Sequence, residues 1–181
     1  IQDCVAHAID PSLSTGPVPV LTPKAQPQHA SAKQHQTGEA SLTGSGLRSQ
    51  ADFPVRGRAL VTDVPITYLG YVNRDSGVIE EPGHPLDGVA IEDTVLVYPK
   101  GSGSTVAPYV LMGLIYTGKG PKAVVNRDIC PLTLPACSLL GVPYGHGFDN
   151  DPCLAVNTGD TVEFRRTPDG VVLEVVERVQ P

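Results

Sequence analysis

Two short apolar runs, residues 95–98 (VLVY) and 123–125 (AVV), most narrowly constrain what this chain folds into. Each run is nearly continuous in apolar side chains, which is typical of a strand buried on both faces of a sheet. The segment between them, 105–118 (TVAPYVLMGLIYTG), is the best helix candidate in the chain. A strand, a crossover helix and a second strand predict a parallel pair with a right-handed connection.

Shorter segments on both sides predict further elements of a sheet. A turn signal (NRDSG) stands at 73–77, and Thr167-Pro168-Asp169-Gly170 predicts a hairpin turn near the end of the chain. The remaining expected elements are strands at 56–61, 65–72 and 142–144, a short helix at 136–141, and the hairpin strands 160–166 and 170–178. Together they predict a compact α/β domain with a barrel-like, β-rich sheet and a few helices.

The first 50 residues have a different composition. Residues 1–9 carry apolar side chains at helical spacing, and Asp10-Pro11 ends that pattern. Residues 10–50 are rich in Pro, Ser, Gln, Thr and Gly, and they contain no aromatic residue. We therefore interpret 1–9 as the end of an upstream domain, 10–50 as a flexible linker and 51–181 as the folded domain. Because the only Met is Met112, we expect an excised or processed chain.

Charge and cysteine content limit the possible functions. The net charge is −6 with a pI near 5.2, which argues against a general nucleic-acid surface. The chain has no apolar run of transmembrane length. Its cysteines, Cys4, Cys130, Cys137 and Cys153, form no metal-binding spacing, which predicts reduced structural thiols and a cytoplasmic location. A disulfide between Cys130 and Cys137 is the alternative.

The loop 100–105 (KGSGST) lies between the first buried strand and the predicted helix. A helix N-terminus exposes unpaired N–H groups, and glycines allow a ligand to approach the backbone closely, so such a loop binds carboxylate or phosphate well. Two interpretations remain open: Ser104 or Thr105 caps the helix, or the loop holds an anion or a catalytic group. A phosphate-binding P-loop and a hydrolase nucleophile elbow are absent, because Lys100 precedes the glycines and Val106 replaces the second elbow glycine.

Other polar residues follow the strands. Asn126-Arg127-Asp128 comes directly after the second buried strand, so we expect it beside the 100–105 loop, where ligands collect in α/β sheets. A salt bridge within these loops is the alternative role. For His84, in a Pro-Gly-His-Pro turn, we expect a structural hydrogen bond, although His84 or His146 as the base of a triad with Ser104 stays open. The run 145–151 (GHGFDND) is interpreted as a loop, with calcium binding as an alternative.

Several of these segments recur together in one protein family. The run RGRALV…PITYLGYVNRDSGVIEEPGHPLDG…VLVYPKGSGSTVAPYVL…AVVNRD…GVPY resembles the small subunit, or swivel domain, of aconitase X, over residues 54–178. The resemblance implies a swivelling β/α/β fold and a dehydratase, or hydro-lyase, acting on a small hydroxy acid such as cis-3-hydroxy-L-proline or mevalonate 5-phosphate. Residues 1–9 resemble the closing helix of the large domain, which implies a single fused chain.

The resemblance also assigns roles. The large domain would hold the iron–sulfur cluster, so this chain would bind no metal and would be active only with that partner. Ser104 would be the proton-abstracting base, Gly103 and Thr105 would contribute donors at the helix start, and Arg127 would contact the substrate or the interface. The competing hypothesis is a non-catalytic module that binds a ligand or partner through the same loop.

Overall fold

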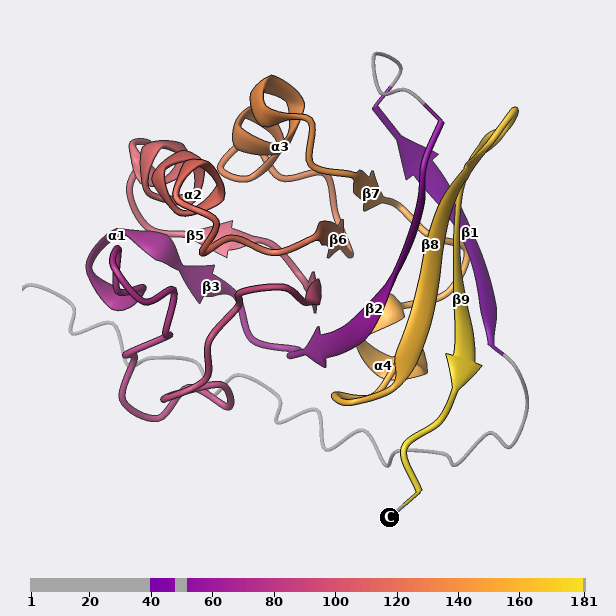
Figure 1. The fold of residues 1–181 in the computed structure, drawn as a ribbon, viewed down its shortest axis with the longest axis horizontal. Coiled ribbons are helices and arrows are strands. Elements are labelled where there is room, and N and C mark those ends of the chain that lie inside the picture. Colours follow the sequence, from indigo (N-terminus) through magenta and orange to yellow (C-terminus); the bar gives the residue numbers. More distant parts are fainter. Residues whose placement is uncertain (1–39, 48–51, 181) are drawn as a thin grey trace, which may run out of the picture. The chain divides into compact units, whose positions relative to one another are not determined.

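The computed structural model describes residues 40–47 and 52–180. Within these residues, a closed barrel has the strand order β1-β7-β6-β4-β2-β8-β9, and β3 and β5 form a separate two-stranded sheet. Figure 1 shows helices α1, α2 and α3 gathered on one side of this barrel. The predicted α/β class with a barrel-like sheet and a few helices is therefore confirmed.

The elements run through the described residues in the order β1 (Ser41–Gly46), β2 (Pro54–Val61), β3 (Ile66–Thr67), α1 (Tyr68–Tyr71), β4 (Val95–Tyr98), β5 (Gly101–Ser102), α2 (Ala107–Tyr116), β6 (Ala123–Asn126), α3 (Leu134–Leu140), β7 (Tyr144–His146), α4 (Pro152–Ala155), β8 (Thr161–Thr167) and β9 (Gly170–Glu177). No helix among them is long and apolar enough to cross a membrane.

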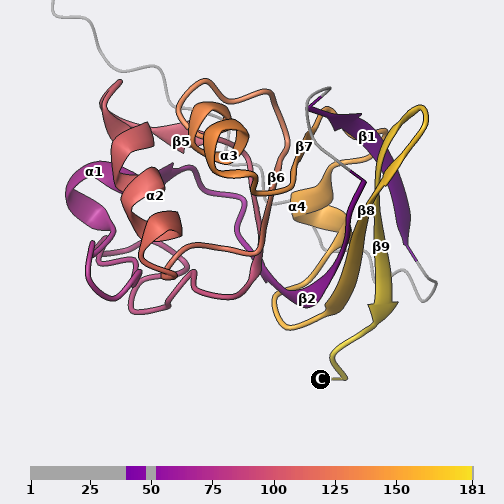
Figure 2. The same ribbon diagram turned by 45° about the horizontal axis from the view of Figure 1, so that its top comes forward.

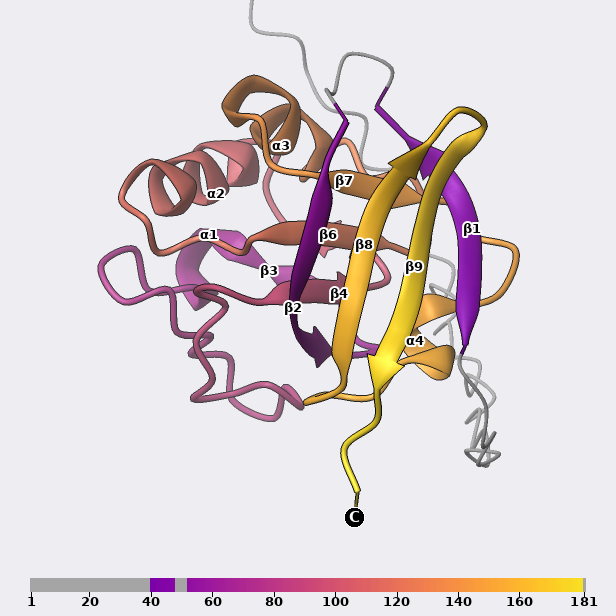
Figure 3. The ribbon, with the colours of Figure 1, turned by 45° about the vertical axis from the view of Figure 1, so that its right-hand side comes forward.

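The barrel combines a parallel and an antiparallel half. Strands β2, β4, β6 and β7 are parallel neighbours, whereas β8 pairs antiparallel with β2 and β9, and β1 pairs antiparallel with β9 and β7. Figure 3 shows β4, β6 and β7 crossing behind the upright strands β2, β8, β9 and β1. The predicted parallel pair is confirmed, because β4 and β6 are parallel neighbours with α2 between them in the chain. The predicted hairpin is also confirmed, as β8 and β9.

The side chains of β4 alternate between two hydrophobic cores, which explains why the strand is apolar throughout. Leu96 and Tyr98 belong to the core that packs against the helices. Val95 and Val97 belong to the core inside the barrel. Figure 2 shows α1, α2 and α3 on one side of β6, with β8 and β9 on the other. Burial on both faces is thus the physical origin of the VLVY pattern.

Strand β1 corrects the predicted linker. Residues 41–46 lie inside the segment 10–50 that its composition predicts to be flexible, yet they close the barrel between β7 and β9. Their glycines serve close packing: a Cβ at Gly44 would lie 2.7 Å from the Phe148 ring, and one at Gly46 would lie 2.5 Å from Val171 Cγ1. The folded domain therefore begins before residue 51, while the predicted upstream helix 1–9 and the segment 10–39 lie outside the described residues.

The segment 65–72 forms less strand than its composition predicts. Only Ile66 and Thr67 are extended partners of β5, and α1 follows as an irregular turn in which Leu69 is extended and Gly70 has φ +92°. The turn predicted at 73–77 is present, since Asn73 Oδ1 accepts hydrogen bonds from the N–H groups of Asp75 and Ser76.

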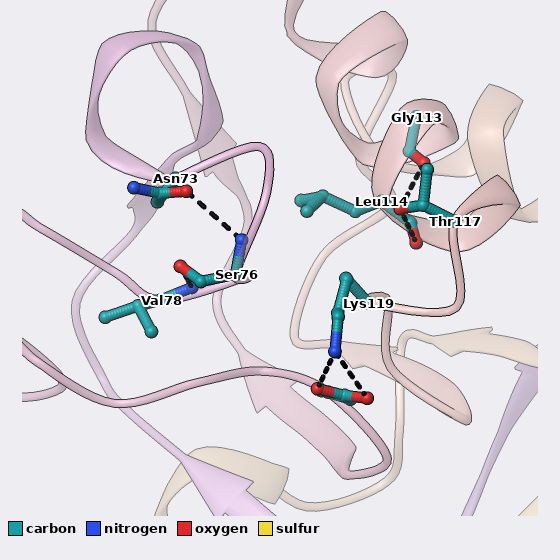
Figure 4. A network of polar contacts seen from close by, with 8 residues as sticks. Asn73, Ser76, Val78, Gly113, Leu114, Thr117 and Lys119 are labelled. Carbon is teal, nitrogen blue, oxygen red and sulfur yellow. Dashed lines mark hydrogen bonds and ion pairs between the residues drawn. The ribbon is translucent and has the colours of Figure 1, made fainter.

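Polar contacts also stabilise the segments before β4 and after α2, which lie next to this turn. The Lys119 ammonium contacts the carboxylate of Glu92 at 3.0 Å. Figure 4 shows Thr117, whose Oγ1 donates to the Gly113 carbonyl at the end of α2. A Cβ at Gly77 would lie only 2.6 Å from the Lys119 carbonyl oxygen, so the turn packs directly on the segment after α2. The long connection from α1 to β4 is thereby tied to the end of the crossover helix.

Candidate functional site

The candidate site lies at the edge where the parallel strands end. The loops after β4 and β6 lie side by side there: the Arg127 N–H donates to the Tyr98 carbonyl at 3.2 Å, and the Asp128 N–H donates to the Pro99 carbonyl at 3.3 Å. The structure therefore brings together the two segments that the sequence places at carboxyl ends of neighbouring strands, as expected for ligand-binding loops of α/β sheets.

The first of these loops bends outward at Gly103. Before the bend, Ser102 is anchored to β3 by a 2.6 Å hydrogen bond between Ser102 Oγ and Thr67 Oγ1. Gly103 has φ +86°, a left-handed conformation that favours glycine, and a Cβ there would lie 3.0 Å from Thr67 Cγ2. Beyond it, Ser104 and Thr105 are exposed. The glycine thus projects the next residues into solvent from a fixed base.

Ser104 occupies the turn that leads into α2. Its Oγ accepts a long, 3.4 Å hydrogen bond from the Val106 N–H, and its carbonyl accepts from the Ala107 N–H at 2.9 Å. Val106 is the N-cap residue, with no side-chain capping bond. Ser104 therefore makes a weak bond ahead of the helix, and Thr105 is not its N-cap residue. Neither Ser104 nor Thr105 is therefore the side-chain cap of α2, and Ser104 keeps its side chain exposed.

A hollow opens beside this loop. It has a volume of about 360 Å³ and is lined by residues 100–103 of one loop and 129–132 of the other. Lys100 is exposed at this hollow, and Cys130 lies buried in its wall. The Lys100 ammonium places a positive charge at this hollow, which favours a small anionic molecule there.

Arg127 has a structural partner at this edge. Its guanidinium contacts the Asp151 carboxylate at 2.7 Å, and this bond raises the pKa of Arg127. Asp151 also accepts from the Cys153 N–H at 2.9 Å and so caps α4. Both side chains are about one-third exposed. The salt bridge considered from the sequence is therefore present, and a ligand contact by Arg127 must compete with it.

The described cysteines are free and buried, so the alternative disulfide between Cys130 and Cys137 is not formed. Burial raises the pKa of Cys137 and of Cys153 to about 12, which keeps both thiols protonated. Among residues 40–47 and 52–180, no group of three or more His, Cys, Asp or Glu side chains could hold a metal ion. This part of the chain therefore does not fit an iron–sulfur cluster site.

His84 and the loop 145–151, also singled out in the sequence, make structural contacts. His84 is buried and its Nδ1 accepts from the Leu86 N–H at 3.1 Å, which confirms the expected structural hydrogen bond. Asp149 Oδ1 accepts from the N–H groups of Thr43 and Asn150 and so ties its loop to β1. These contacts leave the calcium alternative for this loop without support.

Sequence reasoning missed a buried polar group of four residues beneath the loop. These are Tyr68, Tyr98, Cys130 and Thr133, joined by hydrogen bonds of 2.8 to 3.2 Å. A tyrosine in an otherwise apolar buried strand was the available signal, because a buried phenol needs a hydrogen-bond partner. The partner itself could not be identified from the pattern.

The fold and the site together define an α/β barrel domain with an exposed Gly-Ser loop at the edge of its parallel strands. The chain belongs to the aconitase X swivel domain family, whose family model matches residues 47–173. The crystal structure of Thermococcus kodakaraensis aconitase X in its holo-form matches with a TM-score of 0.65 and 25% identity, over 76% of this chain and 99% of that one.

Curated relatives are named for a reaction. The phosphomevalonate dehydratase small subunit of Pyrococcus abyssi is 37% identical over 60% of this chain and 81% of its own length. That of Methanococcoides burtonii is 33% identical over 61% of this chain and 81% of its own length. A dehydratase is a hydro-lyase, and a small subunit works with a large one. The family thus confirms the predicted enzyme class and argues against a purely non-catalytic module.

Proposed function

We propose that this chain contributes the proton-accepting side of a dehydratase active site and that Ser104 is the base. A large aconitase X domain completes the site, and mevalonate 5-phosphate is the substrate. The observation that supports this most is the exposed Ser104 hydroxyl, which follows the left-handed Gly103 next to a hollow of about 360 Å³. Its exposure suits a residue whose substrate is held partly by another domain.

The surroundings of Ser104 suit a transient alkoxide. An ordinary serine hydroxyl is too weak to remove a proton next to a carboxylate, so the negative charge must be stabilised as it develops. The Val106 N–H already points at Ser104 Oγ, and the partial positive charge at the start of α2 acts in the same direction. Backbone groups of Gly103 and Thr105 complete the donors in this proposal.

The substrate preference follows from the relatives and from charge. The relatives are named for phosphomevalonate, which makes a phosphorylated hydroxy acid a better candidate than cis-3-hydroxy-L-proline. Lys100 and the start of α2 provide positive potential for its anionic groups, and Arg127 is a further contact in this proposal.

The remaining parts of the enzyme lie beyond the swivel domain. The iron–sulfur cluster implied by the family would reside in the large domain, while binding of the anionic groups and removal of the proton fall to residues of this chain. In this proposal both parts share one polypeptide, an interpretation supported by the resemblance of residues 1–9 to the closing helix of the large domain.

Replacement of Ser104 tests the proposal. In the enzyme reconstituted with its large domain, Ser104→Ala should lower kcat about 100- to 10,000-fold, the usual contribution of a positioned base. Steady-state dehydration of mevalonate 5-phosphate measures this, and the chain without the large domain is the blank. Ser41→Ala is the matched control, because Ser41 is exposed on β1, across the barrel from α2 (Figure 1). Activity of Ser104→Ala within about twofold of the unaltered enzyme would refute the role of Ser104.

A further inference from the structure

The 100–105 loop has a buried side as well as an exposed one. Gly101 is buried, and its N–H donates to the Cys130 sulfur at 3.1 Å. The Thr133 hydroxyl donates to the same sulfur at 3.2 Å. Sulfur is a weak acceptor, so two donors at these distances indicate that the surrounding structure holds the groups together. The backbone of the loop is thus attached to the core two residues before the outward bend.

The hydroxyl chain continues into the core beneath the helices. Thr133 Oγ1 lies 2.9 Å from the Tyr98 hydroxyl, which lies 2.8 Å from the Tyr68 hydroxyl. Each hydroxyl has a single hydrogen. Because Thr133 donates its hydrogen to sulfur, Tyr98 must donate to Thr133, and Tyr68 must donate to Tyr98. Burial raises the pKa of both tyrosines well above the ordinary value, so the chain stays neutral.

The sulfur at the end of this chain is itself held in place. The Cys130 N–H donates to the Tyr144 hydroxyl at 3.0 Å, and the Cys130 carbonyl accepts from the N–H groups of Thr133 and Leu134 where α3 begins. Gly101 fits closely against this segment, since a Cβ there would lie 3.3 Å from Leu132 Cβ. The sulfur position is therefore set by β7 and α3, outside the loop that it holds.

We propose that Thr133 and Cys130 are positioning residues for the dehydration, an inference that rests on the proposed role of Ser104. The two walls of the hollow, 100–103 and 129–132, are joined by the Gly101 N–H···Cys130 sulfur bond. Loss of the Thr133 hydroxyl removes one donor from that sulfur and leaves the Tyr98 hydroxyl without its acceptor. A wall displaced by about 1 Å misplaces the Ser104 hydroxyl, and such misplacement typically costs about 100-fold in rate.

Thr133→Val is the test, because it keeps the side-chain shape and removes only the hydroxyl. In the reconstituted enzyme, kcat should fall about 10- to 100-fold while KM stays within about threefold, and Thr133→Ser should restore kcat to within about threefold. Tyr68→Phe removes the hydroxyl at the far end of the chain. It should lower the unfolding midpoint to a similar extent as Thr133→Val, yet leave kcat within about threefold. Equal losses of kcat in Thr133→Val and Tyr68→Phe would overturn the proposal.

A second readout needs no activity. Amide hydrogen exchange of Gly101, measured on the 181-residue chain alone, should be at least about tenfold faster in Thr133→Val and unchanged in Thr133→Ser, relative to amides of β9. Unchanged Gly101 exchange in Thr133→Val would overturn the proposal.

The exchange experiment is independent of the proposed base. If Ser104→Ala retains activity, the proposed base is wrong, while Gly101 exchange still decides whether Cys130 and Thr133 hold the 100–105 loop. If Thr133→Val does not fold, Cys130→Ala replaces it and Cys130→Ser replaces Thr133→Ser. Gly101 exchange should then be faster in Cys130→Ala and unchanged in Cys130→Ser, and unchanged exchange in Cys130→Ala would overturn the proposal.

Discussion

At the residue scale, Arg127 lies at the candidate site and also forms a salt bridge with Asp151. Its place at the end of β6 follows from the sequence, since it comes directly after the buried run 123–126. Its 2.7 Å contact with Asp151 does not, because Asp151 belongs to a later loop. The same carboxylate caps α4, so the pair connects the edge of the parallel strands to that helix. A structural and a substrate-binding role for Arg127 predict different kinetics.

Replacing each partner separately distinguishes these roles. Arg127→Ala and Asp151→Asn should each lower the free energy of unfolding by about 1 kcal/mol, because the pair is partly exposed, and the double variant should cost less than the sum. If Arg127 contacts the substrate, Arg127→Ala raises KM about 10-fold whereas Asp151→Asn leaves it within about twofold. Urea denaturation and steady-state kinetics measure both effects. Equal KM values in the two variants would leave Arg127 with only the structural role.

At the element scale, β1 shows that composition can hide a strand. Its sequence, SLTGSG, has one large apolar residue, and its glycines are typical of a linker. Leu42 is nevertheless 1% exposed and packs inside the barrel, and the glycines sit against Phe148 and Val171. The strand depends on surfaces that β7 and β9 provide much later in the chain. Its own local sequence pattern cannot indicate these surfaces.

Truncation of Leu42 tests the role of β1. Leu42→Ala should lower the free energy of unfolding by about 3 kcal/mol, through lost burial and the cavity left behind. Leu139→Ala is the matched control, since Leu139 is 70% exposed on α3, and it should change stability by no more than about 0.5 kcal/mol. Urea denaturation of both variants measures the difference. Similar values for the two would mean that residues 41–46 behave as the linker that their composition predicts.

At the scale of the whole molecule, several buried thiols and phenols among residues 40–47 and 52–180 stay protonated while the two cores are packed. These are Cys137, Cys153, Tyr68, Tyr98 and Tyr144, and burial raises the pKa of each above its ordinary value. Unfolding returns each group to water, where its pKa falls back. The folded chain therefore binds more protons than the unfolded chain in alkaline solution, and its stability is lost as pH rises.

Alkaline denaturation follows from this difference in proton binding. The free energy of unfolding should be constant with respect to these groups below about pH 9 and should fall between about pH 9 and 12, since the thiols titrate near 9 when unfolded and near 12 when folded. Urea denaturation at several pH values measures it. The double variant Cys137→Ala/Cys153→Ala should show a shallower fall at the start of this range. Equal stability of the unaltered chain at pH 8 and 11 would contradict the prediction.

The sequence by itself determined the parallel pair β4 and β6, the crossover helix, the hairpin and the loop that carries Ser104. These features are local, because burial on both faces, helical spacing and turn residues each leave a pattern within one segment. Only the tertiary structure decided that residues 41–46 close the barrel and that Asp151 pairs with Arg127. It also decided that Cys130 and Thr133 together connect Gly101 to Tyr98. Each of these depends on contacts between distant segments, and a short polar or glycine-rich sequence has the same composition whether or not a partner packs against it.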